Sequence, residues 1–394
     1  MRRKMSSTRA VTLAVAGVVA VATAMAAEPQ SVAFKLGTFR DGSRDYLGLV
    51  IKDSQVVDIA AANAAWERRN GSAPKLRVPS DMKDLIARYD GELGPRLREL
   101  ARVASAAGSA DYLRPVSTVK ILPPVRPAVI LNAGANYPEH AAGIIAQGGR
   151  GAGSGPGGPA PAGPPGGAAA GPPAGPPPGF TRQPAQSAPG YWERAADDKR
   201  PDNPYLFLKS PTTVVGANDD VVIPRGREQI DWECEFAVIV GRTAKNVSVA
   251  DAEKYVFGYS IQMDVSDRGG RGDRKMGGGP DWLVQKNHDT FGPIGPYIVP
   301  KEFVAQPMNT RHYFTLNGEI KQDSNTSRME YNHHEMLSFG SNMLTLSPGD
   351  MIALGSPSGT NIERDTPRWM RAGDVGVCVV EGIGEQRHNI VAQK

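Results

Sequence analysis

The segment that decides the fold is residues 229–240, QIDWECEFAVIV, followed by residues 255–271, YVFGYSIQMDVSDRGGR, and residues 281–296, DWLVQKNHDTFGPIGP. In the first part, Glu233 and Glu235 are two positions apart in an apolar run. If this run is a strand, both carboxylates point to one face, about 7 Å apart, and Trp232, Cys234 and Phe236 point to the other. Two acids on one face of an apolar strand repel each other and resist burial.

A bound cation would remove both costs. Asp264 ends the second apolar run and could supply a third carboxylate, and Lys286 follows in the third segment. Taken alone, a Glu-x-Glu pair in a strand more often faces solvent than binds a metal. The additional presence of Asp264, Arg268 and Lys286 favours a metal site.

Length and charge limit the class of protein. The chain has 394 residues, enough for two domains or for one large domain with extensions, and its net charge of +4 is small for this length. No basic stripe with interleaved aromatic residues is present, which argues against nucleic acid as a partner. The two cysteines, Cys234 and Cys378, are far apart in sequence. A disulfide can be neither inferred nor excluded, and two buried small hydrophobic residues are the simpler interpretation.

The first 27 residues resemble a secretory signal peptide. Arg2 and Arg3 begin a positive region, an apolar region follows, and Ala24 and Ala26 fit the small-residue rule for cleavage. The apolar part is short for an uncleaved membrane anchor. We therefore expect residues 1–27 to be removed and the mature protein to be periplasmic or secreted, with no stable membrane span.

Composition then divides the rest of the chain. Residues 28–120 are predicted to form a small N-terminal α+β domain, with an antiparallel sheet over 31–60 and helix over 80–108. Residues 121–394 are predicted to form the main domain. Within it, residues 146–190 are dominated by Gly, Pro and Ala and cannot bury enough apolar surface to offset their chain entropy, so we predict a disordered insertion.

The sequence of the main domain predicts many short strands. The Asn317-Gly318 pair predicts a hairpin turn, and Pro348-Gly349-Asp350 separates two further apolar runs. Near the start of the domain, an apolar strand is expected to run into a polar turn carrying Tyr137 and His140. A histidine in such a place is, taken alone, more often structural than catalytic. Together these patterns predict an α+β, mainly β, fold.

Seven blocks in a fixed order carry a resemblance to a known family. They are NYPEH (136–140), LFLKSPTTVVG (206–216), DWECEFAVIVG (231–241), GYSIQMDVSDR (258–268), QKNHDTFGPIGP (285–296), LNGEIKQ (316–322) and LSPGDMIALGSPSG (346–359). In this order the chain resembles the fumarylacetoacetate hydrolase family from about Val129 to Gly384, apart from the insertion. The resemblance implies a mixed β-roll catalytic domain of the fumarylacetoacetase type, a homodimer and a central divalent metal.

The resemblance assigns the metal ligands. Glu233, Glu235 and Asp264 match the three carboxylate ligands of the family. Oxygen ligands suit a hard cation, so Mg²⁺ is the expected metal, with Mn²⁺ and Ca²⁺ as alternatives.

The resemblance also assigns the other site residues. Lys286 matches the active-site lysine, and His140 matches the histidine that activates water in the hydrolases. Tyr137, Arg268 and Ser356 fall at or near positions that contact the substrate.

These assignments imply a hydrolase that cleaves a C–C bond in an acylpyruvate-like 1,3-diketo acid. Two alternatives stay open. One is a decarboxylase, isomerase, hydratase or lyase of the same fold that acts on a 2-oxo acid. The other is an exported protein that binds metal and ligand without turnover.

Three departures from the family bear on the choice. Many small acylpyruvate hydrolases of the family carry a glutamate three residues after the histidine, where this chain has Gly143. Arg271 stands where the fumarylacetoacetate-cleaving members have a glutamine, and the insertion begins where relatives carry a short lid helix. The first departure favours the non-hydrolytic alternative, unless Glu193, just past the insertion, folds back and serves as the partner of His140.

Overall fold

A computed structural model describes residues 32–147, 198, 200, 203–270 and 281–394 of the chain. The predicted signal peptide, Glu193, Arg271 and all but the first two residues of the predicted insertion lie outside these residues.

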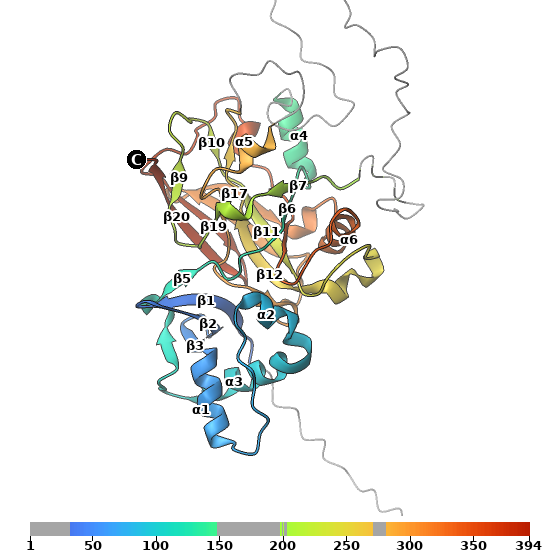
Figure 1. The fold of residues 1–394 in the computed structure, drawn as a ribbon. Helices are drawn as coiled ribbons and strands as arrows, with labels where there is room; N and C mark the ends of the chain where they lie inside the picture. The colour runs from blue at the N-terminus through green and yellow to red at the C-terminus, as the bar shows by residue number, and fades with distance from the viewer. Residues whose placement is uncertain (1–31, 148–197, 199, 201–202, 271–280) are drawn as a thin grey trace, which may run out of the picture. The chain divides into compact units, whose positions relative to one another are not determined.

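The N-terminal part is a five-stranded sheet with helices packed against it (Figure 1). The β1–β2 hairpin turns at Gly42, whose φ of 58° is the left-handed conformation that glycine adopts without strain. The strand order is β4-β3-β2-β1-β5, and the predicted sheet and the predicted helix are both confirmed. The elements are β1 (Lys35–Asp41), β2 (Arg44–Ile51), β3 (Gln55–Asp58), α1 (Ile59–Arg69), α2 (Met82–Ala87), α3 (Gly94–Ala106), β4 (Leu113–Pro115) and β5 (Lys120–Leu122).

A six-stranded mixed sheet forms the centre of the main part, in the order β15-β12-β11-β18-β6-β7. Its strands β11 and β12 are buried along their whole length, which explains the continuous apolar runs of the sequence. Only the β18–β6 pair is parallel. The strands are β6 (Ile130–Ala133), β7 (Leu206–Lys209), β11 (Cys234–Val240), β12 (Val256–Met263), β15 (Val299–Pro300) and β18 (Met351–Ala353).

A second five-stranded sheet has the order β17-β16-β19-β20-β9. The predicted Asn317-Gly318 turn joins β16 to β17, and both of its residues have positive φ. The strands are β9 (Val221–Ile223), β16 (Arg311–Leu316), β17 (Glu319–Asn325), β19 (Val375–Val380) and β20 (Gly384–Ala392).

Short strand pairs and helices complete the main part. The pairs are β10 (Ile230–Asp231) with β13 (Ser266–Asp267), and β8 (Val214–Val215) with β14 (Gly292–Pro293). The helices include α4 (Pro138–Ala146), the 3₁₀ helix η4 (Val249–Tyr255), α5 (Trp282–Lys286), α6 (His333–Met343) and the short 3₁₀ helix η7 (Asn361–Glu363). The fold is therefore α+β and mainly β, as predicted.

The two sheets of the main part share one apolar core. Trp232 stacks on Phe314 with ring centroids 5.3 Å apart, and both side chains are fully buried. Cys234, on the same face of the strand as Trp232, forms a disulfide with Cys378 of β19. The expectation of two separate buried cysteines was therefore wrong, because the strands that carry them come together in this core although 144 residues separate them in sequence.

The N-terminal sheet is packed against the main part. Leu36 pairs with Ile298 through backbone hydrogen bonds, and the Tyr89 hydroxyl donates to Glu302 at 2.5 Å. One hydrophobic cluster contains residues of β1 and α3 together with residues of β11 and β18. The boundary predicted near residue 120 thus lies within a shared core.

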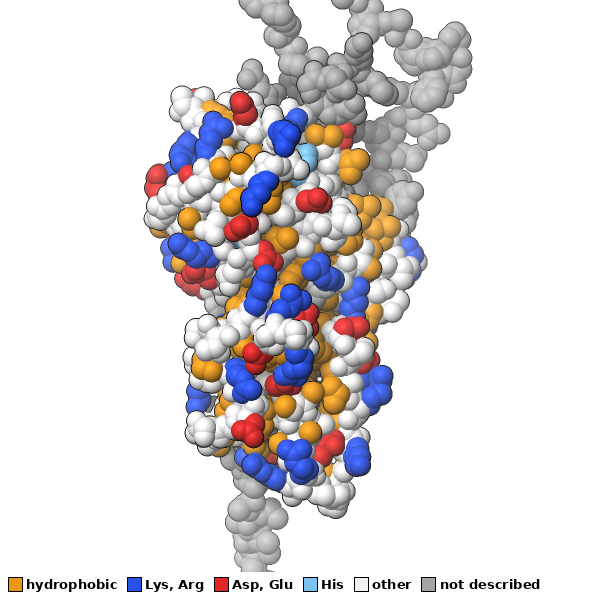
Figure 2. Space-filling model, turned by 60° about the vertical axis from the view of Figure 1, so that its left-hand side comes forward, with side chains coloured by type: hydrophobic (Ala, Val, Ile, Leu, Met, Phe, Trp, Pro, Cys, Tyr) orange, Lys and Arg blue, Asp and Glu red, His pale blue; other side chains and the backbone are white. Residues whose placement is uncertain are grey.

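The helices and the surface charges give two further properties of the protein. None of the helices in the described part of the chain is both long and apolar enough to cross a bilayer. Figure 2 shows basic side chains interspersed with acidic and hydrophobic ones on the face it presents, in keeping with the small net charge of +4.

Candidate active site

Three carboxylates lie close together where β11 begins and β12 ends. Glu233 lies in the gap between β10 and β11, Glu235 is the second residue of β11, and Asp264 directly follows β12. The antiparallel register brings them together, because the Asp264 amide donates to the Glu233 carbonyl at 2.9 Å. Each is at most 5% exposed, and their oxygens can lie within 4.8 Å of one another. The predicted ligand set is therefore one cluster.

Two buried lysines contact this cluster. The Lys286 ammonium, at the end of α5, lies 2.6 Å from a carboxylate oxygen of Glu233 and 2.6 Å from one of Asp264. The Lys209 ammonium, at the end of β7, donates to the other Asp264 oxygen at 2.6 Å and to the Lys286 carbonyl at 2.5 Å. Both ammonium groups are almost inaccessible to solvent, and their ion pairs with these carboxylates offset the cost of burying a charge.

Arg268 adds a third cation. Its guanidinium donates to Glu233 and, at 3.1 Å, to Asp231. Asp231 also accepts hydrogen bonds from the amides of Asn361 and Ile362. Arg268 thus connects the carboxylate cluster to the segment that carries η7.

The protonation states indicate what the cluster can hold. Burial alone would raise the pKa of Glu233, but Lys286, Arg268 and His140 lower it well below its usual value. Burial, followed by the charges of Asp264 and Glu233, raises the pKa of Glu235 well above its usual value. Glu235 therefore holds a proton unless a further positive charge is present. A divalent cation with oxygen ligands supplies such a charge, and the three carboxylates fit one.

His140 lies beside the cluster on α4. Its Nδ1 is 2.5 Å from Oε1 of Glu363, the last residue of η7, and both side chains are largely buried. Glu363 is itself held by the Thr360 hydroxyl, which donates to it at 2.6 Å, and by the amide of Gly359. Burial alone would raise the pKa of Glu363, but His140 and Thr360 lower it, so this carboxylate stays ionised.

Gly143 makes the contact between His140 and Glu363 possible. A Cβ at this position would lie 2.7 Å from Cγ of Glu363, closer than real Cβ contacts come. The glutamate that the sequence comparison found missing after His140 is thus replaced by one from a distant part of the chain. The segment itself is a helix rather than the expected polar turn, with Pro138 in its first turn, where proline is favoured.

Tyr137 is fully buried, and its hydroxyl lies 2.8 Å from His312 Nε2. His312 Nδ1 lies 3.1 Å from the Cys234 carbonyl, which can only accept, so Nδ1 carries the proton and Nε2 accepts from Tyr137. Burial lowers the pKa of His312 to about 4 and keeps the ring neutral. This relay supports the backbone between the two glutamates.

Ser356 lies in the loop after β18, next to Gly355, whose amide donates to Glu235 at 2.9 Å. The Ser356 hydroxyl accepts from Gln322 at 2.8 Å and donates to the Pro357 carbonyl. Gly355 has a φ of 94°, and a Cβ there would lie 2.9 Å from Asn136. The loop is thus fixed against the cluster, while the substrate contacts predicted for Tyr137, Arg268 and Ser356 stay predictions.

Lys209 and Glu363 are two residues of the site that were not predicted from the sequence. Lys209 is a charged residue in the otherwise apolar strand LFLK, and such a position indicates a buried partner. Glu363 ends the motif Thr360-Asn-Ile-Glu363, a capping box that was visible in the sequence. That signal predicts a helix start, and only the fold shows that the same carboxylate reaches His140.

Comparison with known proteins identifies the family. Residues 181–391, more than half of the chain, match the model of the fumarylacetoacetate (FAA) hydrolase C-terminal domain. The chain belongs to the fumarylacetoacetate hydrolase family. The resemblance inferred from the seven blocks is confirmed, and with it the fold.

Curated relatives include oxaloacetate tautomerase Fahd2a of Rattus norvegicus, 36% identical over 184 residues, which are 47% of this chain and 58% of the relative. The chain thus spans little more than half the length of such relatives. An uncharacterized protein of Pyrococcus abyssi is 36% identical over 208 residues, 52% of this chain and 88% of that protein.

Solved structures also resemble this fold. Maleylpyruvate hydrolase from Sphingobium sp. SYK-6, in complex with manganese(II) and pyruvate, is 25% identical with a TM-score of 0.59. The match covers 91% of this chain and all of that one. The family is enzymatic, and the proteins similar to this chain include a hydrolase and tautomerases.

Proposed function

We propose that this member of the fumarylacetoacetate hydrolase family is a metal-dependent hydrolase that cleaves a C–C bond in acylpyruvate-like 1,3-diketo acids. The observation that carries the proposal is the His140–Glu363 pair beside the carboxylate cluster. With this pair, the chain has both parts that such hydrolysis needs, a cation site for the enolate and a base for water.

The pair orients the base. Because Glu363 is ionised, His140 Nδ1–H donates to it, and Nε2 is left as the nitrogen that can take a proton. Deprotonation by Nε2 lets a water oxygen bond to the acyl carbon. The bond from this carbon to the neighbouring methylene then breaks, its electron pair remains on the methylene carbon as an enolate, and a proton returned there completes pyruvate or its analogue. The other product is a carboxylic acid.

The cations and carboxylates around this base have separate roles. Glu233, Glu235 and Asp264 would hold the divalent cation, which polarises the keto oxygens and stabilises the enolate. Mg²⁺ is our first choice, and the manganese complex of the maleylpyruvate hydrolase is the comparison that supports a divalent metal. Lys286 is positioned to stabilise negative charge on the substrate.

The decisive experiment uses the mature chain from Glu28. Metal is removed with a chelator, Mg²⁺ or Mn²⁺ is restored, and the ultraviolet absorbance of a short acylpyruvate is followed while the products are identified. Metal-dependent formation of two acids supports hydrolysis. Ligand binding without turnover across a panel of 2-oxo acids would instead indicate a binding protein.

A tautomerase is the second candidate, because the relative from Rattus norvegicus, 36% identical over the matched residues, is an oxaloacetate tautomerase. The same Nε2 of His140 could move a proton between the carbon and oxygen of a 2-oxo acid without using water. A rapid change of the enol absorbance of oxaloacetate, with no new acid formed, distinguishes this activity from hydrolysis.

We also propose that the protein is exported. The signal-like residues 1–27 motivate this, and the Cys234–Cys378 disulfide supports it, since disulfides persist mainly in oxidising compartments. Amino-terminal sequencing of the protein from a periplasmic fraction tests it, and a mature chain that still begins at Met1 in the cytosol would contradict it.

A homodimer is proposed as the assembly. Three large hydrophobic side chains on neighbouring elements, Tyr205 and Leu208 near or on the edge strand β7 and Leu283 on α5, are 46–73% exposed. Such a group fits a contact with a second copy. Light scattering should give twice the chain mass, and Leu208→Lys should lower it toward that of one chain.

A further inference from the structure

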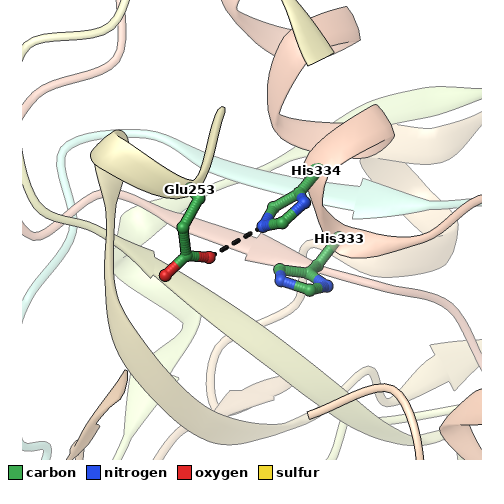
Figure 3. A group of neighbouring side chains, drawn as sticks. All are labelled: Glu253, His333 and His334. Carbon is green, nitrogen blue, oxygen red and sulfur yellow. Dashed lines mark hydrogen bonds and ion pairs between the residues drawn. The ribbon is translucent and has the colours of Figure 1, made fainter. Parts of the chain in front are cut away.

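A second group of possible metal ligands lies away from the carboxylate cluster. Glu253 of η4 and His333 and His334 of α6 each offer a ligand atom, and these atoms lie within 4.8 Å of one another. Figure 3 shows the three side chains side by side, with His334 Nε2 bonded to a Glu253 oxygen 2.8 Å away. The two imidazole rings have centroids 4.0 Å apart.

His333 has an unused nitrogen. The residue is only 5% exposed, its Nε2 lies 3.2 Å from the Tyr259 hydroxyl, and its Nδ1 is buried with no hydrogen-bond partner among the described residues. A buried polar atom without a partner is unfavourable, and a bound ion is one way to satisfy it. A neutral imidazole has one ring nitrogen whose lone pair can bind an ion.

The two carboxylate oxygens of Glu253 have different partners. Lys301 pairs with Oε1 of Glu253 at 3.2 Å and also contacts its backbone carbonyl, while Oε2 faces His334. Burial alone would raise the pKa of Glu253, but His334 and Lys301 lower it, so it is an anion. Glu253 is half exposed and His334 about 30% exposed, which gives an ion access from solvent.

We propose that Glu253, His333 and His334 form a second metal site, selective for a first-row transition ion such as Zn²⁺, Co²⁺ or Cu²⁺. Two imidazole nitrogens and one carboxylate oxygen suit these ions, whereas Mg²⁺ takes oxygen ligands. Water completes the coordination on the exposed side. The ion would join η4 to the first turn of α6, and its role is to stabilise this contact.

The donor atoms distinguish this site from the active site, whose three ligands are all carboxylates. Cu²⁺ is therefore the sharpest probe, because electron paramagnetic resonance resolves couplings to bound imidazole nitrogen. The metal-free mature chain, without a histidine tag, is titrated with Cu²⁺ and with Co²⁺, and the bound equivalents are measured after equilibrium dialysis.

We expect the wild type to bind one more equivalent of Cu²⁺ than His334→Ala does. The nitrogen couplings in the Cu²⁺ spectrum of the wild type should be lost in His334→Ala. These couplings persist in His140→Ala, which removes a histidine beside the carboxylate cluster. Glu253→Gln should weaken Co²⁺ binding at least tenfold, whereas Glu319→Gln, a matched change at an exposed glutamate paired with a lysine, should not.

A thermal readout guards against misfolded variants. Zn²⁺ should raise the Tm of the wild type by several degrees and should have less effect on His334→Ala, whose Tm without metal stays near that of the wild type because the side chain is partly exposed. The proposal is overturned if the wild type and His334→Ala bind equal amounts of Cu²⁺ with the same spectrum.

Discussion

His140 Nδ1 lies 2.5 Å from Glu363 Oε1 although 223 residues separate the two in the chain. Gly143 leaves the space that the Glu363 side chain occupies, so Glu363 can reach His140 only because position 143 has no side chain. The arrangement can therefore be tested by substitutions at Glu363 and at Gly143.

Replacing Glu363 by Gln should lower kcat for acylpyruvate hydrolysis by on the order of 10²–10³-fold, because His140 loses the anion that orients it and stabilises its protonated form. Metal affinity should change little. Steady-state kinetics with a separate Mn²⁺ titration checks this, with Glu381→Gln at the surface as the control. Unchanged kcat would remove Glu363 from the mechanism.

The glutamate can be moved back to the helix. Gly143→Glu places a carboxylate three residues after His140 on α4, within reach of the same face, but it clashes with Glu363. We expect Gly143→Glu alone to be poorly active and the double variant Gly143→Glu with Glu363→Ala to regain at least tenfold over Glu363→Ala. The same kcat measurement decides, and no gain in the double variant would show that geometry beyond the carboxylate matters.

Lys209 should matter as much as Lys286 for the cluster. Lys209→Met removes the ammonium from Asp264 while keeping the volume of the side chain, and leaves a buried carboxylate less compensated. Without metal, the free energy of unfolding of the variant should be lower than that of the wild type by roughly 3–5 kcal/mol. The variant should therefore unfold at a lower denaturant concentration. Divalent metal should restore part of this difference, and a metal-independent loss would mean that Lys209 acts only through packing.

Acid should destabilise the fold through His312. Its pKa is about 4 in the native protein and near 6.5 when unfolded, so the unfolded chain binds a proton that the native chain does not. Stability is therefore full above about pH 6.5 and falls as the pH is lowered toward 4, by on the order of 3 kcal/mol from this group. Urea unfolding across this range should show a shallower fall in His312→Gln, whereas the more exposed His334→Gln should follow the wild type.

Much of the fold followed from the sequence because its signals are local. The alternation around Glu233, the Asn317-Gly318 turn and the apolar run ending at Asp264 each depend on neighbours in the chain, and the structure contains all three features. The carboxylate cluster followed as well, since strand geometry places Glu233 and Glu235 on one face.

The remaining site features depend on contacts that span the chain. Nothing local to Glu363 says that η7 packs against α4, and nothing local to Lys209 says that β7 ends at Asp264. The helix α4 was missed for a different reason, because a Gly- and Ala-rich segment has a weak helical pattern.

Removing the disulfide should cost stability. Replacing Cys234 and Cys378 together by Ala frees a loop of 144 residues in the unfolded chain, which should lower the free energy of unfolding by about 3–5 kcal/mol. Because Cys234 lies between Glu233 and Glu235, two of the three proposed metal ligands, Mn²⁺ affinity should fall too. Denaturant curves and metal titration test both effects, and wild-type stability in the double variant would contradict the assigned bond.

The same bond has a consequence for how the protein withstands proteolysis. A single backbone cut anywhere between residues 234 and 378 leaves both fragments on one covalent molecule, and the three clustered carboxylates remain tied to β19. Such a nicked chain would keep the mobility of the whole protein on a denaturing gel until a thiol is added. Samples judged intact without reductant can therefore conceal cleavage within the catalytic part.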